Sequence, residues 1–141
     1  MIPNEVQLKG TFRTMDENWR RDALQKIKHT AEGIAAALGA SANLRIVSGY
    51  PFLHNDPPLT HALRTRAEHY MGSENVVDLP LRMSSEDFAF YSQVIPACFY
   101  RLGTGNASKG ITAPVHTQTF DVDEDCLLYS TGLMAWLALG D

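Results

Sequence analysis

The chain has 141 residues, of which 45% are hydrophobic and 20% are charged. This length and composition are typical of a globular protein that buries a core, arranged as one compact domain or two small lobes. The formal net charge is -4, from 12 Lys and Arg against 16 Asp and Glu, and neither sign forms a long block. The composition therefore indicates neither a nucleic-acid surface nor a basic membrane-binding patch.

No stretch approaches the roughly 20 apolar residues of a membrane helix, and the N-terminus lacks the basic and apolar regions of a signal peptide. We therefore expect a cytoplasmic protein that does not bind membranes. Cys98 and Cys126 lie far apart and form no CxxC motif, which predicts two reduced thiols and neither a disulfide framework nor a zinc knuckle.

The first predicted elements are a strand, a helix and a strand. Residues 4–14 alternate apolar and polar side chains, as in a strand with one solvated face. Asp16 can cap a long helix that stops at Gly39, and residues 42–51 then predict a second strand and a turn. The apolar residues of this helix recur every three or four positions and predict a buried face: Trp19, Leu24, Ile27, Ala31, Ile34, Ala35 and Leu38.

A second helix is predicted between Asp56, as its N-cap, and Gly72, with prolines in its first turn. Residues 76–80 then predict a short buried strand. Ser84 stands three residues before Asp87, close to a capping box, and predicts a short helix.

Residues 97–106 predict a strand that leads into a glycine-rich turn. Asp121 stands three residues before Glu124 and predicts the start of a C-terminal helix. The predicted inner face of that helix consists of Leu127, Ser130, Thr131, Met134, Leu137 and Ala138. Strands and helices alternate along the chain, which favours an α/β fold with parallel strands. The strongest candidate boundary between lobes is the turn-rich segment 48–58.

Histidines are the first candidates for chemistry. His61 and His69 share a predicted helix but lie about 12 Å apart at 1.5 Å per residue, so they do not easily share one metal ion. His116 lies in a loop between a glycine-rich turn and the C-terminal helix, and loops at strand ends often carry function. A single histidine supplies one ligand, whereas a zinc site needs three or four, so spacing alone favours an ordinary loop histidine.

Five segments in order resemble a known family almost from end to end: "IPNEVQLKGTFRT", "HNDPPLT", "SSEDFAFY", "RLGTGN" and "PVHTQTFDVDED". They are similar to the C-terminal part of the hippurate hydrolase and N-acyl-amino-acid amidohydrolase family, within the superfamily of dinuclear-metal aminoacylases and carboxypeptidases. The resemblance implies an α/β catalytic domain interrupted by an α+β, ferredoxin-like lid that commonly dimerises. Residues 1–51 would be the second half of the lid, and residues 52–141 would be the end of the catalytic domain.

The resemblance also implies roles for individual residues. His116 matches the last metal-binding histidine of the family, and Arg13 matches a lid arginine that reaches the substrate carboxylate, although a strand arginine is more often simply solvated. The remaining matches would line the substrate cleft: Ser84, Ser85 and Glu86, where the family usually has a glycine-rich stretch, and Gly103 and Asn106. Asn55, just before the Asp56 cap, is interpreted as structural.

The family binds two zinc or manganese ions, but its other metal ligands and its general-base glutamate lie in an N-terminal half without a counterpart here. We therefore expect no catalytic residue in this segment. The resemblance implies hydrolysis of an N-acyl amino acid or peptide by the complete enzyme, with this chain inactive alone and dimerising through the lid. The alternative is a non-catalytic remnant or self-association module, because an exposed lid edge favours pairing with another chain.

Overall fold

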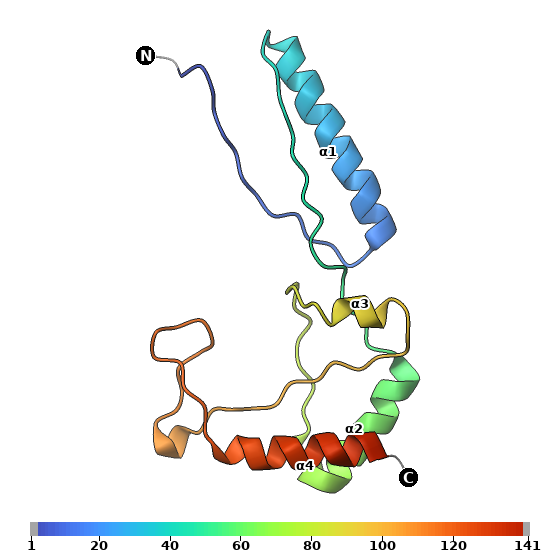
Figure 1. Ribbon diagram of the computed structural model, residues 1–141, viewed down its shortest axis with the longest axis vertical. Coiled ribbons are helices and arrows are strands. Elements are labelled where there is room, and N and C mark those ends of the chain that lie inside the picture. The colour runs from blue at the N-terminus through green and yellow to red at the C-terminus, as the bar shows by residue number, and fades with distance from the viewer. Residues whose placement is uncertain (1–2, 140–141) are drawn as a thin grey trace. The chain divides into compact units, whose positions relative to one another are not determined.

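The computed structural model describes residues 3–139, which form helices joined by non-helical segments (Figure 1). The described chain divides into two compact units. The first comprises the residues up to Leu53 together with Leu81–Gln93, and the second comprises His54–Pro80 and the residues from Val94 onward. These units do not test the division at residues 51 and 52 into a lid and a catalytic part, which stays a prediction.

The first unit is built around the helix α1, Glu17–Ala37. The Asp16 carboxylate accepts the amide N–H of Trp19 at 2.9 Å, and Gly39 follows the helix with a φ of 74°. Because the side-chain cap satisfies a free N–H and glycine tolerates positive φ at no steric cost, both ends are fixed locally. The predicted first helix is confirmed at both ends.

The N-terminal turns of α1 hold the chain on either side of the helix. Phe12 stacks on Trp19 with ring centroids 5.7 Å apart. The Arg20 guanidinium donates to the Tyr50 carbonyl at 3.3 Å, and the Glu17 carboxylate accepts from the Phe52 amide at 3.1 Å. These contacts tie the segments before and after the helix to its first turns.

The prediction that one apolar face of α1 is buried was wrong for this chain. None of the residues of α1 is buried, and the side chains of Trp19 and Ile34 are 55% and 58% exposed. The heptad-like spacing predicts a face that can pack, but burial needs a second surface, and no other element of the described residues covers this one.

The second unit contains the paired helices α2, Pro57–Met71, and α4, Asp125–Leu139. Asp56 caps α2 by accepting the Leu59 amide at 2.9 Å, which confirms the predicted start of this helix. The C-cap Gly72 has a φ of 86° and leads into the short helix η1, Ser73–Asn75. The helix therefore ends where the glycine predicted it.

Aromatic side chains join α2 to α4. The rings of Tyr70 and Trp136 lie 6.3 Å apart, and the Trp136 indole N–H donates to the Arg66 carbonyl at 3.1 Å. Leu133 and Leu137 are the buried residues of α4, whereas Leu127 and Met134 are 61% and 59% exposed. The predicted inner face is thus confirmed at Leu137, was wrong at Leu127 and Met134, and omitted Leu133, because α4 is apolar on most sides and its pattern defines no single face.

The strands predicted near residues 4–14, 42–51, 76–80 and 97–103 are not formed in the part of the chain that the structure describes. These segments run as non-helical traces (Figure 1). An alternating pattern becomes a strand only when a neighbouring strand completes its backbone hydrogen bonds. The single bridge recorded between described residues joins Asn106 to Ile111.

In the second unit, the Asn55 side chain forms hydrogen bonds with backbone groups of the segment that was predicted to be a strand. The Asn55 amide donates to the Phe99 carbonyl at 2.9 Å and accepts from the Phe99 amide at 2.8 Å. The backbone amide of Asp56 donates to the Ala97 carbonyl at 2.8 Å. Asn55 therefore has the structural role that the sequence indicated.

Two predicted caps differ from the structure. The short helix α3, Ala89–Ser92, begins without a side-chain cap, so the prediction of a Ser84 cap was wrong. The Asp125 backbone amide donates to the Asp123 carboxylate at 3.3 Å. The Asp121 carboxylate instead accepts from the backbone amide of its neighbour Val122. Asp121 is therefore not the N-cap, because α4 begins only at Asp125. No helix among residues 3–139 is long and apolar enough to cross a membrane.

Candidate functional site

In the first unit, the structure brings Arg13 to the segment that carries the predicted cleft residues. The Arg13 guanidinium donates to the Met83 carbonyl at 2.7 Å, across 70 positions in sequence. Ser84 and Ser85 are exposed, and Glu86 is half-buried with its carboxylate accepting the Asp87 amide at 3.1 Å. The bond to Met83 uses one of five guanidinium N–H groups. Two of the sequence-predicted segments are thus joined.

In the second unit, Asn106 closes a tight turn that follows the exposed Gly103. Its backbone pairs with Ile111 in both directions, at 2.8 and 2.9 Å. Its side-chain oxygen accepts the Ser108 amide at 3.1 Å and caps the short helix η2, Ala107–Lys109. Its side-chain NH₂ donates to Asp123 at 2.6 Å. Both ends of the Asn106 amide are therefore engaged within this loop.

His116 lies in the second unit, exposed, within a turn of the loop between η2 and α4. Its φ of 67° is in the left-handed region, and His116 is the one non-glycine residue with positive φ in the described range. The Thr117 hydroxyl donates to the Pro114 carbonyl at 2.8 Å, and the Phe120 amide donates to Thr117 at 3.3 Å. Left-handed backbone is uncommon for residues with a Cβ, so the turn is held by its surroundings.

A charged cluster that the sequence did not reveal lies at the base of this loop. The Lys109 ammonium donates to Asp123 and to Asp125, each at 2.6 Å. The hydrogen bond from Lys109 lowers the pKa of the Asp123 carboxyl, and the hydrogen bond from Asn106 lowers it further. The same carboxylates raise the pKa of Lys109, Asp123 first. The charged forms of both partners are thus stabilised by each other.

The metal role predicted for His116 was compared with the donors around it. Among residues 3–139, no group of three or more His, Cys, Asp or Glu side chains is placed to hold a metal ion. A site for zinc needs three or four protein ligands. The described residues therefore do not fit a pair of metal ions by themselves.

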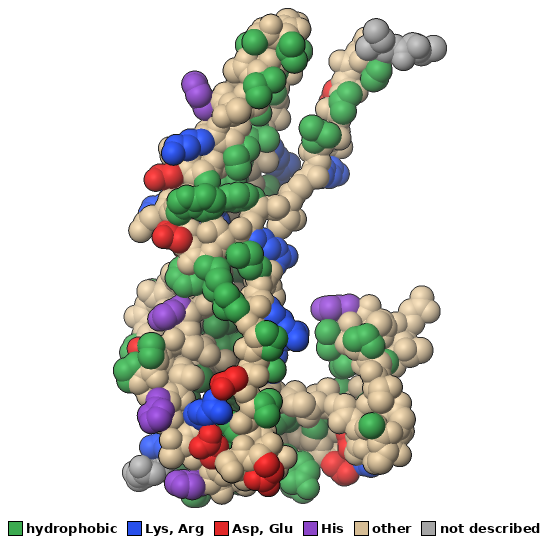
Figure 2. All heavy atoms as spheres, turned by 180° about the vertical axis from the view of Figure 1, so that it is seen from behind, with side chains coloured by type: hydrophobic (Ala, Val, Ile, Leu, Met, Phe, Trp, Pro, Cys, Tyr) green, Lys and Arg blue, Asp and Glu red, His purple; other side chains and the backbone are tan. Residues whose placement is uncertain are grey.

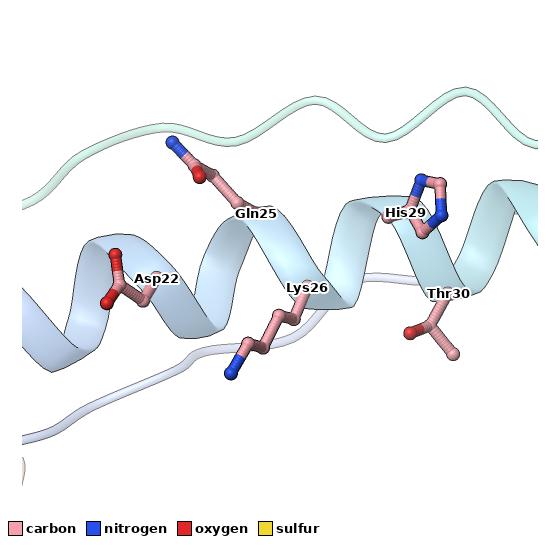
Figure 3. A pocket seen from close by; sticks show the side chains of 5 residues that line it. All are labelled: Asp22, Gln25, Lys26, His29 and Thr30. Atoms are coloured by element: carbon pink, nitrogen blue, oxygen red, sulfur yellow. The ribbon is translucent and has the colours of Figure 1, made fainter.

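A shallow hollow runs along the solvated side of α1 in the first unit. Figure 3 shows its five side chains along one face of the helix, with none reaching across to close it. All of them are exposed and polar: Asp22, Gln25, Lys26, His29 and Thr30. This arrangement is the ordinary solvated face of an amphipathic helix, on which His29 is a surface residue.

The sequence was compared with protein-family models. The model described as peptidase family M20/M25/M40 matches residues 6–139, nearly the whole chain. The chain belongs to this peptidase family. The family resemblance predicted from the five ordered segments is therefore confirmed.

The M20/M25/M40 assignment agrees with the names of similar proteins. The chain is 34% identical over 133 residues to the uncharacterized hydrolase y4tI of Sinorhizobium fredii, covering 94% of this chain and 33% of that protein. It is 30% identical over 140 residues to thermostable carboxypeptidase 2 of Saccharolobus solfataricus, covering 99% and 35%. It is also 30% identical over 139 residues to the N-acetylcysteine deacetylase of Bacillus subtilis, again covering 99% and 35%.

This M20/M25/M40 chain spans about a third of the length of the curated relatives that it matches. No solved structure matches it. The roles of Arg13, His116 and the predicted cleft residues stay predictions, since the described geometry places them without testing what they bind.

Proposed function

We propose that this chain is the C-terminal segment of a metal-dependent amidohydrolase that cleaves the amide bond of N-acyl amino acids of the hippurate type. The observation that carries the proposal is the family match across residues 6–139, together with relatives named as a hydrolase, a carboxypeptidase and a deacetylase. The names carboxypeptidase and N-acetylcysteine deacetylase both denote hydrolysis of an amide or peptide bond, and the third name denotes hydrolysis alone. We take the enzyme to be cytoplasmic.

Arg13 is proposed to bind the free carboxylate of the substrate. A guanidinium is planar and offers parallel N–H donors, which suits bidentate binding of a carboxylate. The bond from Arg13 to the Met83 carbonyl would hold the arginine beside Ser84, Ser85 and Glu86, which are proposed to line the substrate cleft. Replacing Arg13 should thus raise KM more than it lowers kcat.

His116 is proposed to supply one donor to a pair of zinc or manganese ions. When bound, such ions polarise a carbonyl and lower the pKa of a bound water. The donors among the described residues are too few to hold them, so the remaining ligands would come from an N-terminal part of the enzyme. The 141-residue chain is accordingly proposed to be inactive alone.

The proposed fold explains the unpaired segments. Residues 1–51 would be half of an α+β lid that dimerises, and residues 52–141 would close an α/β catalytic domain. In the complete enzyme, the non-helical segments near residues 4–14 and 97–103 would pair with strands outside this chain. The alternating side chains of residues 4–14 support this arrangement, because a one-faced strand gains its stability from such pairing.

A chimera tests the proposed function. The aligned part of this chain, 99% of its length, would replace the matching part of the Bacillus subtilis deacetylase, and hydrolysis of N-acetylcysteine and hippurate would be measured with added zinc or manganese. We expect activity in the chimera and none in the isolated chain. The His116→Ala chimera should lose at least 100-fold in kcat/KM, as expected for a metal ligand.

The matched control is His61→Ala, which removes another exposed histidine of the same unit. It should leave kcat/KM within about twofold, and both variants should retain the helix content of the parent chimera. An active, folded His116→Ala chimera would contradict the metal role of His116. Robust turnover by the isolated chain would contradict its proposed inactivity.

The second candidate function is self-association without catalysis. It is favoured by the exposed apolar side chains, which are visible as green spheres on the surface in Figure 2. Exposed apolar residues include Leu38, the C-cap of α1, at 80% exposure and Leu128 of α4 at 77%. Contiguous apolar patches on soluble monomers are generally small. Sedimentation showing a monomer at high concentration would count against this candidate.

A further inference from the structure

The two ends of the loop that carries His116 lie next to each other in the second unit. Asn106 pairs with Ile111 at one side, and the Asp123 amide donates to the Thr104 carbonyl at 2.8 Å at the other. The chain from Ala107 to Val122 is thus closed at its base, with His116 in its distal part. We refer to the side chains of Asn106, Lys109, Asp123 and Asp125 as the loop-base cluster.

Asp123 is the central member of the loop-base cluster. One carboxylate oxygen accepts from Lys109 and the other from Asn106, both at 2.6 Å. Asp123 as a whole residue is 9% exposed, and it is the one charged residue that is buried between residues 3 and 139. Buried charge is tolerated when it is paired and hydrogen-bonded, and here both oxygens have partners. The cluster is therefore a built feature of the loop, in which each contact crosses its base.

We infer that Lys109 and Asp123 are positioning residues that hold the His116 loop in the conformation seen here, before any other part of the enzyme is present. The Lys109 ammonium crosses 14 residues to Asp123 and 16 to Asp125, so it joins the start of the loop to its end. The left-handed backbone of His116 needs a loop that is fixed at its ends. The claim that an ordered loop helps His116 to bind a metal ion rests on the proposed function. The claim that Lys109 and Asp123 order the loop does not depend on it.

A second cluster in the same unit offers a matched comparison. Arg64 also pairs with two carboxylates, bonding Glu68 at 2.9 Å and Asp78 at 2.5 Å. It ties α2 to the segment after η1 and makes no recorded contact with the loop from Ala107 to Val122. Loss of Arg64 should therefore lower the stability of the unit without loosening the His116 loop.

The test uses the 141-residue chain, labelled with ¹⁵N and ¹³C, without added metal. Lys109→Met removes the ammonium but keeps a long side chain, Lys109→Arg keeps a cation, and Arg64→Met is the control. The readouts are the backbone order parameter and the imidazole resonances of His116, assigned with His116→Ala. Hydrogen exchange is also measured at the amide of Ile111, which bonds Asn106 within the turn that carries Lys109, and at the amide of Asp123, which bonds Thr104 across the loop base.

We expect Lys109→Met to speed exchange at Ile111 at least tenfold, and to lower the His116 order parameter from about 0.85 to below about 0.6. Lys109→Arg should restore most of the order, and Arg64→Met should change neither readout. The inference is overturned if Lys109→Met leaves the loop as rigid as before. It is equally overturned if Arg64→Met loosens the loop as much, since the effect would then be general destabilisation.

These readouts separate the inference from the proposed function. An ordered loop that Lys109→Met loosens supports the inference even if the His116→Ala chimera stays active. Conversely, an inactive His116→Ala chimera supports the metal role even if Lys109→Met leaves the loop unchanged.

Discussion

Replacing Gly132 with alanine sets helix propensity against packing between α2 and α4. Gly132 lies inside α4, where alanine would be favoured by about 1 kcal/mol if nothing touched it. A Cβ at this position would lie 1.9 Å from the Tyr70 hydroxyl oxygen and 2.9 Å from the adjacent ring carbon. The Tyr70 ring would have to move away from Trp136, with which it is in contact.

The packing effect should be the larger of the two. Overpacking of this kind costs about 1–3 kcal/mol, and the displaced aromatic pair is part of that cost. Subtracting the helix gain of about 1 kcal/mol leaves a net destabilisation of about 1 kcal/mol. Urea unfolding of Gly132→Ala, followed by Trp136 fluorescence in a Trp19→Phe background, measures it, because the chain has two tryptophans.

Gly33 supplies the matched control in α1. No atom lies within 4 Å of a Cβ at Gly33, so Gly33→Ala should stabilise α1 by about 1 kcal/mol in unfolding followed by circular dichroism. In a Tyr70→Ala background the obstacle at Gly132 is gone, and Gly132→Ala should then stabilise as well. If Gly132→Ala stabilises equally with and without the Tyr70 ring, the packing of α2 on α4 described here is wrong.

Three further predictions concern the second unit. Asn55→Ala removes both hydrogen bonds to Phe99 and should cost about 2 kcal/mol in urea unfolding, at about 1 kcal/mol each. Asp56→Ala removes the cap on the Leu59 amide and should cost about 1 kcal/mol, with lower helicity by circular dichroism. Because the fold lowers the pKa of Asp123, its stabilisation is complete above about pH 4 and is lost as pH falls through the lowered pKa, which unfolding at several pH values measures.

Each of these predictions has its own control. Asn75→Ala removes an exposed amide bonded to the Met71 carbonyl and should cost less than half as much as Asn55→Ala. Asp16→Ala removes the corresponding cap of α1, so an unchanged helicity in both cap variants would contradict the capping argument. Asp123→Asn should flatten the pH profile below about pH 4; an unaltered profile would exclude Asp123 as its source.

Helix ends could be predicted from the sequence because their signals are local. Asp16 and Asp56 each bond an amide three residues ahead, and Gly39 and Gly72 adopt the positive φ that a helix stop uses. Each of these features depends on only a few neighbouring residues, so it forms largely independently of the rest of the fold. The predicted strands depend instead on distant segments, because the backbone groups of a strand form hydrogen bonds with a neighbouring strand.

The candidate site could be predicted only in part for the same reason. The sequence places His116 in a loop before the last helix, which the structure bears out. The pairing of Lys109 with Asp123 was missed because it crosses 14 residues. The acids of residues 121–125 lie at the predicted start of the last helix. One of them instead closes the loop, and only its burial distinguishes it from the others.

The apolar surface of α4 is largely exposed in this chain. α4 carries apolar residues on most sides, and helices of that kind are normally enclosed by other elements. Here Leu133 and Leu137 are buried while Leu128 and Leu139 are 77% and 81% exposed. The caps of α1 and α2, the glycine turns that follow them and the loop base are formed within the chain, whereas strand pairing and burial of most of the apolar surface of α4 are not. That division between local and long-range interactions is what the proposed function predicts for one third of a larger catalytic fold.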